Sequence, residues 1–226
     1  MNKPMYEALE AYMYDCMKDS AHDREHIFRV LYTALYIEAK TREKVDYDVL
    51  VAACLLHDTG RSEQFADPKV CHAQAGGIKA KNFLLKNNWD EKRAEHVNQC
   101  ISTHRYRGNN IPGSIEAKIL FDADKLDASG CLGIARTLLY QGQAGEPIYT
   151  TGTDGICDGE NPEAPESFYR EYNFKLKRLY SQFYTPAAKR LARKNKKAAE
   201  KFFNSLRDEI SGILKHKNLI NQFISG

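Results

Sequence analysis

The sequence predicts an all-α protein. Apolar residues recur at the three- and four-residue spacing of a helix through most of the chain, and no stretch alternates apolar and polar residues long enough to predict a strand. The chain has 226 residues, of which 42% are hydrophobic. That is enough to build the core of one large domain, or of one domain with a small subdomain. We therefore expect a helical bundle with further helices at its C-terminal end.

The bounds of the expected helices follow from apolar spacing and from the positions of Gly, Pro and capping side chains. In the first part of the chain we expect helices at residues 4–18, 22–40, 46–57, 70–86, 90–104 and 114–127. Residues 61–69 and 105–113 are expected as loops. The helix at 46–57 is apolar on nearly every side, which is typical of a central, buried helix.

The second part of the chain is less periodic. After Gly130 and Gly133, a further helix is expected to end near Tyr140. Two last helices are expected at about 167–182 and 187–217. We expect three parts: a core with its N-terminal helix at 1–140, a long loop or lid at 141–166, and C-terminal helices at 167–226 that pack on the core. The middle part carries five glycines and three prolines between residues 141 and 167, with no clear period.

Several features favour a cytoplasmic protein. The first 20 residues hold four acidic side chains and do not resemble a signal peptide, and no apolar run reaches the length that a membrane span needs. The six cysteines never form a Cys-x-x-Cys pair, and several lie within apolar helical patterns. Buried free thiols in a reducing compartment are therefore expected, rather than disulfides or a thiolate zinc site.

Three short segments carry residues that ligate metals. A His57-Asp58 doublet ends the apolar helix and is followed by Thr59-Gly60. Upstream lies DREHIFRV at residues 23–30, and downstream lies FDADKLD at residues 121–127. Adjacent side chains diverge by about 100° on a regular helix, so the doublet can reach one ion only where the helix ends. Imidazole nitrogen and carboxylate oxygen together suit Mn, Fe, Co, Ni or Zn, with Mg possible.

On these three segments the sequence resembles the HD-domain phosphohydrolase superfamily, and within it the small cytosolic bacterial proteins that keep Asp-Ala-Asp-Lys/Arg-Leu at the last ligand. The resemblance covers about residues 20–140. It implies a single HD-domain helical bundle with a C-terminal helical extension. It also implies one divalent ion (Mn, Mg, Co, Ni or Fe) held by His26, His57, Asp58 and Asp124. Four such ligands leave about two octahedral positions for water and substrate oxygens.

Other residues near these ligands are expected to support the chemistry. Asp127 lies three residues after Asp124 on the same helical face and is expected to orient a ligand. Asp122 points about 200° away and is expected to cap or to lie on the surface. His72 and His104 are assigned, with Asp58, to catalysis, through phosphate binding or proton transfer. Their alternative role is to bind a second metal.

Positive charge accompanies the ligands. Arg61 follows the doublet, Lys125 adjoins Asp124, and Arg29 lies one turn after His26. Arginine and lysine bind phosphate oxygens, so we expect these three to contact substrate. The alternative is that each balances a neighbouring carboxylate.

The resemblance implies a metal-dependent phosphohydrolase that cleaves a phosphate ester or a pyrophosphate bond in a small metabolite, expected to be a nucleotide. No Gly-x-x-x-x-Gly-Lys loop is present, so a P-loop NTPase is not supported. One alternative is an HD-domain di-iron oxygenase, which would need His72 and His104 as ligands of a second iron. Another is a nucleic-acid-binding or regulatory module that uses the basic C-terminal helix.

The basic segment yields a prediction. Residues 175–217 hold 13 Lys or Arg against 3 Asp or Glu, but no aromatic residues interleave with the basic ones between Lys189 and Lys201. We expect only weak, non-specific binding of nucleic acid at a salt concentration of about 0.15 M. A salt series of binding isotherms measures this. A tight complex with one defined sequence at that concentration would contradict it.

Overall fold

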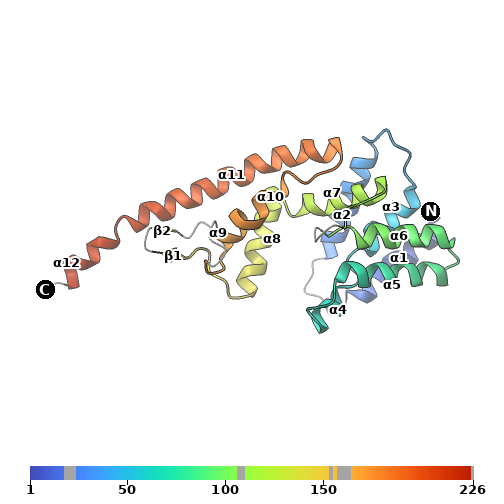
Figure 1. Ribbon diagram of the computed structural model, residues 1–226, viewed down its shortest axis with the longest axis horizontal. Coiled ribbons are helices and arrows are strands. Elements are labelled where there is room, and N and C mark those ends of the chain that lie inside the picture. Colours follow the sequence, from blue (N-terminus) through green and yellow to red (C-terminus); the bar gives the residue numbers. More distant parts are fainter. Residues whose placement is uncertain (18–23, 106–109, 153–154, 157–163, 225–226) are drawn as a thin grey trace. The chain divides into compact units, whose positions relative to one another are not determined.

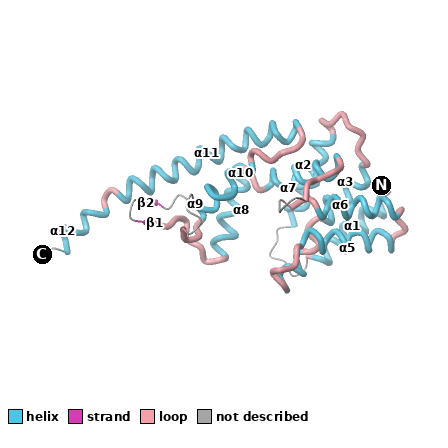
Figure 2. Tube along the Cα trace, viewed as in Figure 1, coloured by secondary structure: helices cyan, strands magenta, loops and turns pink. Residues whose placement is uncertain are grey.

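The computed structural model describes residues 1–17, 24–105, 110–152, 155–156 and 164–224 (Figures 1 and 2). The chain folds into two compact units. The first comprises Met1–Asp127 with Phe183–Ala188, and the second comprises Ala128–Gln182 with Lys189–Gly226. Helices make up nearly all of the regular structure, so the expected all-α fold class is confirmed. The three domain boundaries expected from the sequence stay a prediction.

The first unit is built from helices throughout. They are α1 (Lys3–Cys16), α2 (Arg24–Glu38), α3 (Tyr47–Leu56), α4 (Arg61–Ala66), α5 (His72–Lys86), α6 (Glu91–Ser102) and α7 (Ile115–Asp127). Apart from α4, each corresponds within a few residues to an expected helix. Asp23, an expected N-cap of the second helix, lies outside the described residues.

Helix α3 is the centre of this unit. Every residue from Val49 to Leu56 is buried, and α1, α2, α5, α6 and α7 all contact it. The side chain of Asp46 caps its first turn by accepting a hydrogen bond of 3.2 Å from the Val49 amide. A helix enclosed on all sides needs no polar face, which is why its sequence is almost uniformly apolar. Its C-terminal end, at Leu56, is also buried inside the unit.

Asp122 is a buried residue that binds the segment before another helix, and it does not lie on the surface. It is fully buried and accepts hydrogen bonds from the amides of Tyr184 (2.9 Å) and Thr185 (2.7 Å) and from the Thr185 hydroxyl (2.7 Å). The expected surface placement is wrong, and so is the capping role, because the hydroxyl that caps the following helix is that of Thr185, which accepts a hydrogen bond of 3.2 Å from the Ala188 amide. The partners lie far apart in sequence because Asp122 is on α7, while residues 184–185 precede α11 (Pro186–Leu214).

The second unit is less regular. It contains α8 (Gly130–Gln143), strands β1 (Thr151–Gly152) and β2 (Gly155–Ile156), α9 (Phe168–Glu171), the π-helical turn η1 (Tyr172–Leu176), α10 (Lys177–Leu179) and most of α11, followed by the 3-10 turn η2 (Lys217–Ile220) and α12 (Asn221–Ile224). The strands pair antiparallel, Thr151 opposite Ile156. A small aromatic core holds α9, η1 and α11 together, with Tyr172 stacked on Phe203 at 3.7 Å between ring centroids.

Three expectations need correction. The segment 61–69 is not all loop, because α4 covers residues 61–66 and Pro68 lies beyond its end. The segment 141–166 contains the end of α8 and a two-stranded hairpin, since strands of two residues carry no detectable period. The helix expected at 167–182 ends at Leu179 and includes a π-helical turn.

The thiols follow the expectation in part. Cys54 and Cys100 are buried free thiols, Cys16 and Cys71 are partly buried, and Cys131, in the first turn of α8, is exposed. Cys157 lies outside the described residues. Within the described part of the chain, no helix combines the length and apolar character that crossing a membrane requires.

The buried hydrogen bonds of Asp122 predict a large effect on stability. In Asp122→Ala, two backbone amides and a hydroxyl lose their acceptor inside the protein. We expect the free energy of unfolding to fall by about 2–4 kcal/mol, measured by urea unfolding followed by circular dichroism. Asp208→Ala, which removes an exposed carboxylate paired with Arg207, should change it by less than about 0.5 kcal/mol. Equal effects of the two substitutions would contradict the assignment.

Candidate metal centre

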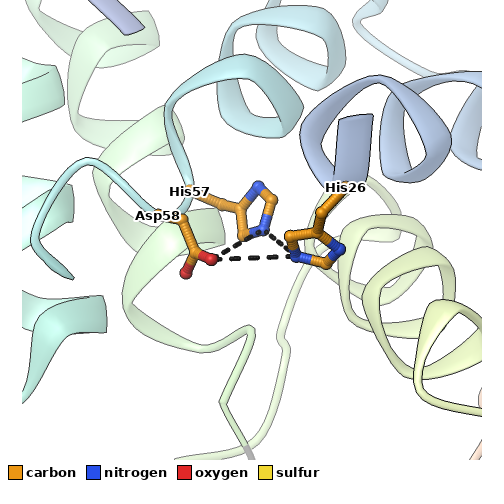
Figure 3. Close-up of side chains that lie close together, drawn as sticks. All are labelled: His26, His57 and Asp58. Carbon is orange, nitrogen blue, oxygen red and sulfur yellow. Dashed lines mark hydrogen bonds and ion pairs between the residues drawn. The ribbon is translucent and has the colours of Figure 1, made fainter. Parts of the chain in front are cut away.

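The expected ligands come from separate helices and meet at the end of α3. His57 is the C-cap of α3 and Asp58 follows it, while His26 lies on α2 and Asp124 on α7. Figure 3 shows His26, His57 and Asp58 pointing toward one another. Each of these three side chains is at most 3% exposed.

The turn after α3 lets both members of the doublet face inward. The Thr59 amide donates to the Leu56 carbonyl (3.2 Å) and the Arg61 amide to the Asp58 carbonyl (3.1 Å). Gly60 is required here, because a Cβ on it would lie 2.2 Å from the His72 carbonyl oxygen and 2.5 Å from the Gly76 nitrogen. The glycine thus allows the first turn of α5, with His72, to pack directly on the doublet.

The first group of ligand atoms is compact. The Nε2 atoms of His26 and His57 lie 3.2 Å apart, and Asp58 Oδ2 lies 3.7 Å from the first and 3.8 Å from the second. Among the described residues, Asp58 Oδ2 has no hydrogen-bond partner. Burying an unpartnered carboxylate oxygen beside two ring nitrogens is costly unless a cation lies between them. The residues present therefore fit a divalent metal ion.

The outer nitrogens of these histidines are fixed by hydrogen bonds. His57 Nδ1 donates to the Cys54 carbonyl (2.8 Å), and His26 Nδ1 donates to Asp127 Oδ2 (2.7 Å). In the neutral rings the protons thus lie on Nδ1, which leaves both Nε2 lone pairs toward the centre. Burial lowers the pKa of His57, which favours the neutral, ligating form. Asp127 makes the contact that its expected supporting role requires.

Asp124 approaches the group from α7. Its Oδ1 lies 3.4 Å from His26 Nε2, and its Oδ2 accepts a hydrogen bond of 2.7 Å from Lys125. Burial alone would raise the pKa of Asp124, but Lys125 and the histidines outweigh burial and lower it. The carboxylate is therefore ionised at neutral pH, as a metal ligand must be.

A second group shares Asp58. Its Oδ1 lies 3.6 Å from His72 Nε2 and 3.9 Å from His104 Nε2, so the two oxygens of Asp58 face two pairs of histidines. His104 Nδ1 donates to the Ile101 carbonyl (2.6 Å) and His72 Nδ1 to Gln64 Oε1 (2.8 Å). Burial lowers the pKa of His104 to about 3, and burial with Arg61 lowers the pKa of His72 to about 2. Both rings are therefore neutral.

Each of the expected substrate-binding cations contacts a carboxylate of this cluster. Arg61 Nε donates to Asp58 Oδ1 (2.9 Å), Lys125 contacts Asp124, and Arg29 donates from Nε to Asp127 Oδ1 (2.7 Å) and from Nη2 to Oδ2 (3.3 Å). This is the arrangement of the charge-balancing alternative. Substrate contact by these three residues stays a prediction.

Sequence reasoning missed Gln64, which holds His72. Arg105 also lies beside this histidine, with its Nη1 3.4 Å from His72 Nδ1. A signal for Gln64 was present. It lies three residues after Arg61, so a short helix over residues 61–66 places both side chains on one face, toward the doublet.

The buried histidines predict acid instability of the metal-free protein. Unfolded His72 and His104 take up protons near pH 6.5, whereas in the folded protein their pKa values are about 2 and about 3. The free energy of unfolding should thus fall by about 1.5 kcal/mol per histidine between about pH 6.5 and about pH 5. Chelated protein unfolded in urea over this range measures it.

His72→Gln should remove the share of this loss that one histidine contributes, about 1.5 kcal/mol, while His216→Gln, at an exposed position, should leave the loss unchanged. The range lies above the ordinary pKa of carboxylates, so Asp and Glu contribute little to it. A free energy of unfolding that is constant from pH 7 to pH 5 would contradict the neutral buried rings.

The comparisons with known proteins agree with this geometry. Residues 24–129 match the family model of the HD domain. Bacillus subtilis YpgQ is 29% identical over 201 residues, which cover 87% of this chain and 88% of YpgQ. The crystal structure of YpgQ in complex with ADP has a TM-score of 0.69 at 27% identity, covering 93% of this chain and 97% of that one.

A second solved structure, an HD-superfamily hydrolase from Bacillus thuringiensis, has a TM-score of 0.67 at 27% identity and covers 92% of this chain and 97% of its own. The similarity extends beyond the matched domain, over both units. The expected ligands lie inside the matched range, and the structure groups His26, His57 and Asp58, with Asp124 beside His26. Residues 24–129 thus form an HD domain.

Proposed function

We propose that this protein is a metal-dependent phosphohydrolase that acts on a small phosphorylated metabolite, with nucleotides as the substrate class. The bond cleaved is a phosphate ester or a pyrophosphate bond. The observation that carries the proposal is the group formed by His26, His57 and Asp58, buried, with Asp58 Oδ2 lacking a partner among the described residues. A cluster of this kind, with further histidines and cations around it, suits an anionic substrate.

In this proposal His26, His57, Asp58 and Asp124 hold one divalent ion. Two nitrogen and two oxygen ligands suit Mn, Fe, Co or Ni, with Mg possible. This ligand set contains no thiolate, so it does not favour soft metals such as Cu(I). When bound, the ion would polarise a phosphoryl oxygen and lower the pKa of a water molecule. The chain supplies the orientation, through the hydrogen bonds to Asp127 and to the Cys54 carbonyl.

In this proposal His72 and His104 act as hydrogen-bond acceptors beside Asp58 Oδ1. Each presents a neutral Nε2, and His72 Nε2 has no hydrogen-bond partner among the described residues. A neutral ring can accept a hydrogen bond from the attacking water and orient it. The negative charge of an incoming phosphate would raise the pKa of both rings, which favours proton uptake.

The cations of the cluster favour phosphate. Arg61 is 27% exposed, Arg29 28% and Lys125 16%, so each can still be reached from solvent while it contacts its carboxylate. Arginine forks and a lysine at the edge of a dry site bind phosphate oxygens strongly. The ADP bound to YpgQ supports a nucleotide as the substrate here.

One observation favours the di-iron oxygenase as a second candidate. Asp58 faces His26 and His57 with one oxygen and His72 and His104 with the other, which is how a carboxylate bridges two metals. Against it, Arg61 donates to the oxygen that the second metal would need. We therefore place hydrolysis first.

The metal site is tested with Asp58→Ala. The substitution removes a ligand, so purified protein should lose most bound metal and all phosphate or pyrophosphate release from nucleotides, while keeping its helical circular dichroism. Its melting temperature should fall to that of chelated wild type, because bound metal stabilises the folded state. The control is Asp67→Ala, at an exposed position directly after α4, which should retain both metal and activity. Full activity of Asp58→Ala would refute the proposal.

The histidines of the second group separate the two candidate functions. His72→Ala and His104→Ala should retain about one metal per chain and lose about 10²–10⁴-fold in turnover. Metal analysis and a phosphate-release assay on the same samples measure both. Two irons per chain, lost together when either histidine is replaced, would establish the oxygenase instead.

A further inference from the structure

The two oxygens of Asp58 have different partners, although their surroundings offer the same kinds of ligand. Oδ2 faces the Nε2 atoms of His26 and His57 and has no hydrogen-bond partner among the described residues. Oδ1 faces the Nε2 atoms of His72 and His104 and also accepts a 2.9 Å hydrogen bond from Arg61. Each half thus contains one carboxylate oxygen and two ring nitrogens, but a fixed positive charge contacts the Oδ1 half.

All four rings hold their Nε2 atoms in the ligating orientation. They follow one another at 5.2 Å between the centroids of His26 and His57, 5.2 Å between His57 and His104, and 5.4 Å between His104 and His72. At Nδ1, His104 is bonded to the Ile101 carbonyl and His72 to Gln64 Oε1, and Arg105 Nη1 lies 3.4 Å from the same His72 nitrogen. Ligand type and orientation alone would therefore permit a second cation beside Oδ1.

The guanidinium of Arg61 opposes that cation. It lies within hydrogen-bonding distance of the same oxygen, so a dication bound there would lie a few ångströms from a permanent positive charge in a buried setting, where repulsion is weakly screened. Arg61 is the first residue of α4, directly after the turn at Gly60, so the backbone fixes its approach to Asp58.

From this geometry we infer that Arg61 sets the metal stoichiometry: its guanidinium takes the place of a second cation at Asp58 Oδ1. The cluster then binds one divalent ion on the Oδ2 side and keeps His72 and His104 as neutral acceptors. The inference rests on the proposed metal site and adds a specificity-determining residue to it. Without the charge of Arg61, the second half becomes a metal site.

The test is the number of Mn²⁺ ions bound per folded chain, measured by elemental analysis after dialysis and by calorimetric titration of the metal-free protein. Arg61→Met removes the charge and keeps most of the side-chain bulk. Arg61→Lys keeps a charge near Oδ1. Lys79→Met is the matched control, because Lys79 is also 27% exposed and also pairs with a carboxylate, Glu63 of α4 (2.7 Å), rather than with Asp58.

We expect one Mn²⁺ in wild type, Arg61→Lys and Lys79→Met, and two in Arg61→Met. The paired ions should give the exchange-coupled paramagnetic resonance signal of a dinuclear site. Adding His72→Ala to Arg61→Met should return the count to one, which locates the second ion. Arg61→Gln repeats the measurement with a polar side chain, and circular dichroism establishes that each variant is folded.

One Mn²⁺ in both folded Arg61→Met and Arg61→Gln would overturn the inference and leave the proposed function standing. Two in wild type would also overturn it, because Arg61 would then not exclude the second ion. None in wild type would refute the metal site itself and, with it, the proposed function. The failure of either proposal is thus distinguishable from the failure of the other.

Discussion

The buried carboxylate of Asp58 is the group on which the rest of the cluster depends. It is 1% exposed, and an ion buried to that degree costs several kcal/mol unless opposite charge and hydrogen-bond donors surround it. Burial would raise the pKa of Asp58, but Arg61 and the histidines around it hold the pKa well below its usual range. Because those partners come from α2, α4, α5 and the end of α6, the helices of the first unit must meet at one point for Asp58 to remain charged.

The ends of two helices orient histidine rings of the cluster. The last carbonyls of a helix lack partners within the helix, and two of them accept the Nδ1 proton of a histidine three residues further on. Cys54 does this for His57 at the end of α3, and Ile101 does it for His104 at the end of α6. In both cases one hydrogen bond satisfies a carbonyl and fixes a ring so that its Nε2 faces Asp58. The end of a helix is therefore where a ligand can be oriented without further side chains.

Most of the helices and the order of the ligands could be predicted from the sequence, because both depend on local spacing and on short motifs. The doublet at the end of an apolar helix required a termination there, and Thr59-Gly60 supplied it. The contact from Arg61 to Asp58 was only one of two alternatives, and the support of His72 by Gln64 was missed, because both depend on α4, a helix of six residues whose polar sequence and nearby Pro68 resemble a loop. The paired strands at Thr151–Gly152 and Gly155–Ile156 were missed because each is two residues long.

The distribution of charge links metal binding to substrate binding. Asp58, Asp124 and Asp127 each contact a cation of their own, Arg61, Lys125 and Arg29 respectively, so these pairs are close to neutral. A divalent ion would add two positive charges that these pairs do not balance. A phosphate group carries up to two negative charges and would balance them in a dry site, where such interactions are strong. In the proposed function the metal and the anionic substrate would therefore strengthen each other's binding, and the paired cations would keep the cluster folded in the absence of both.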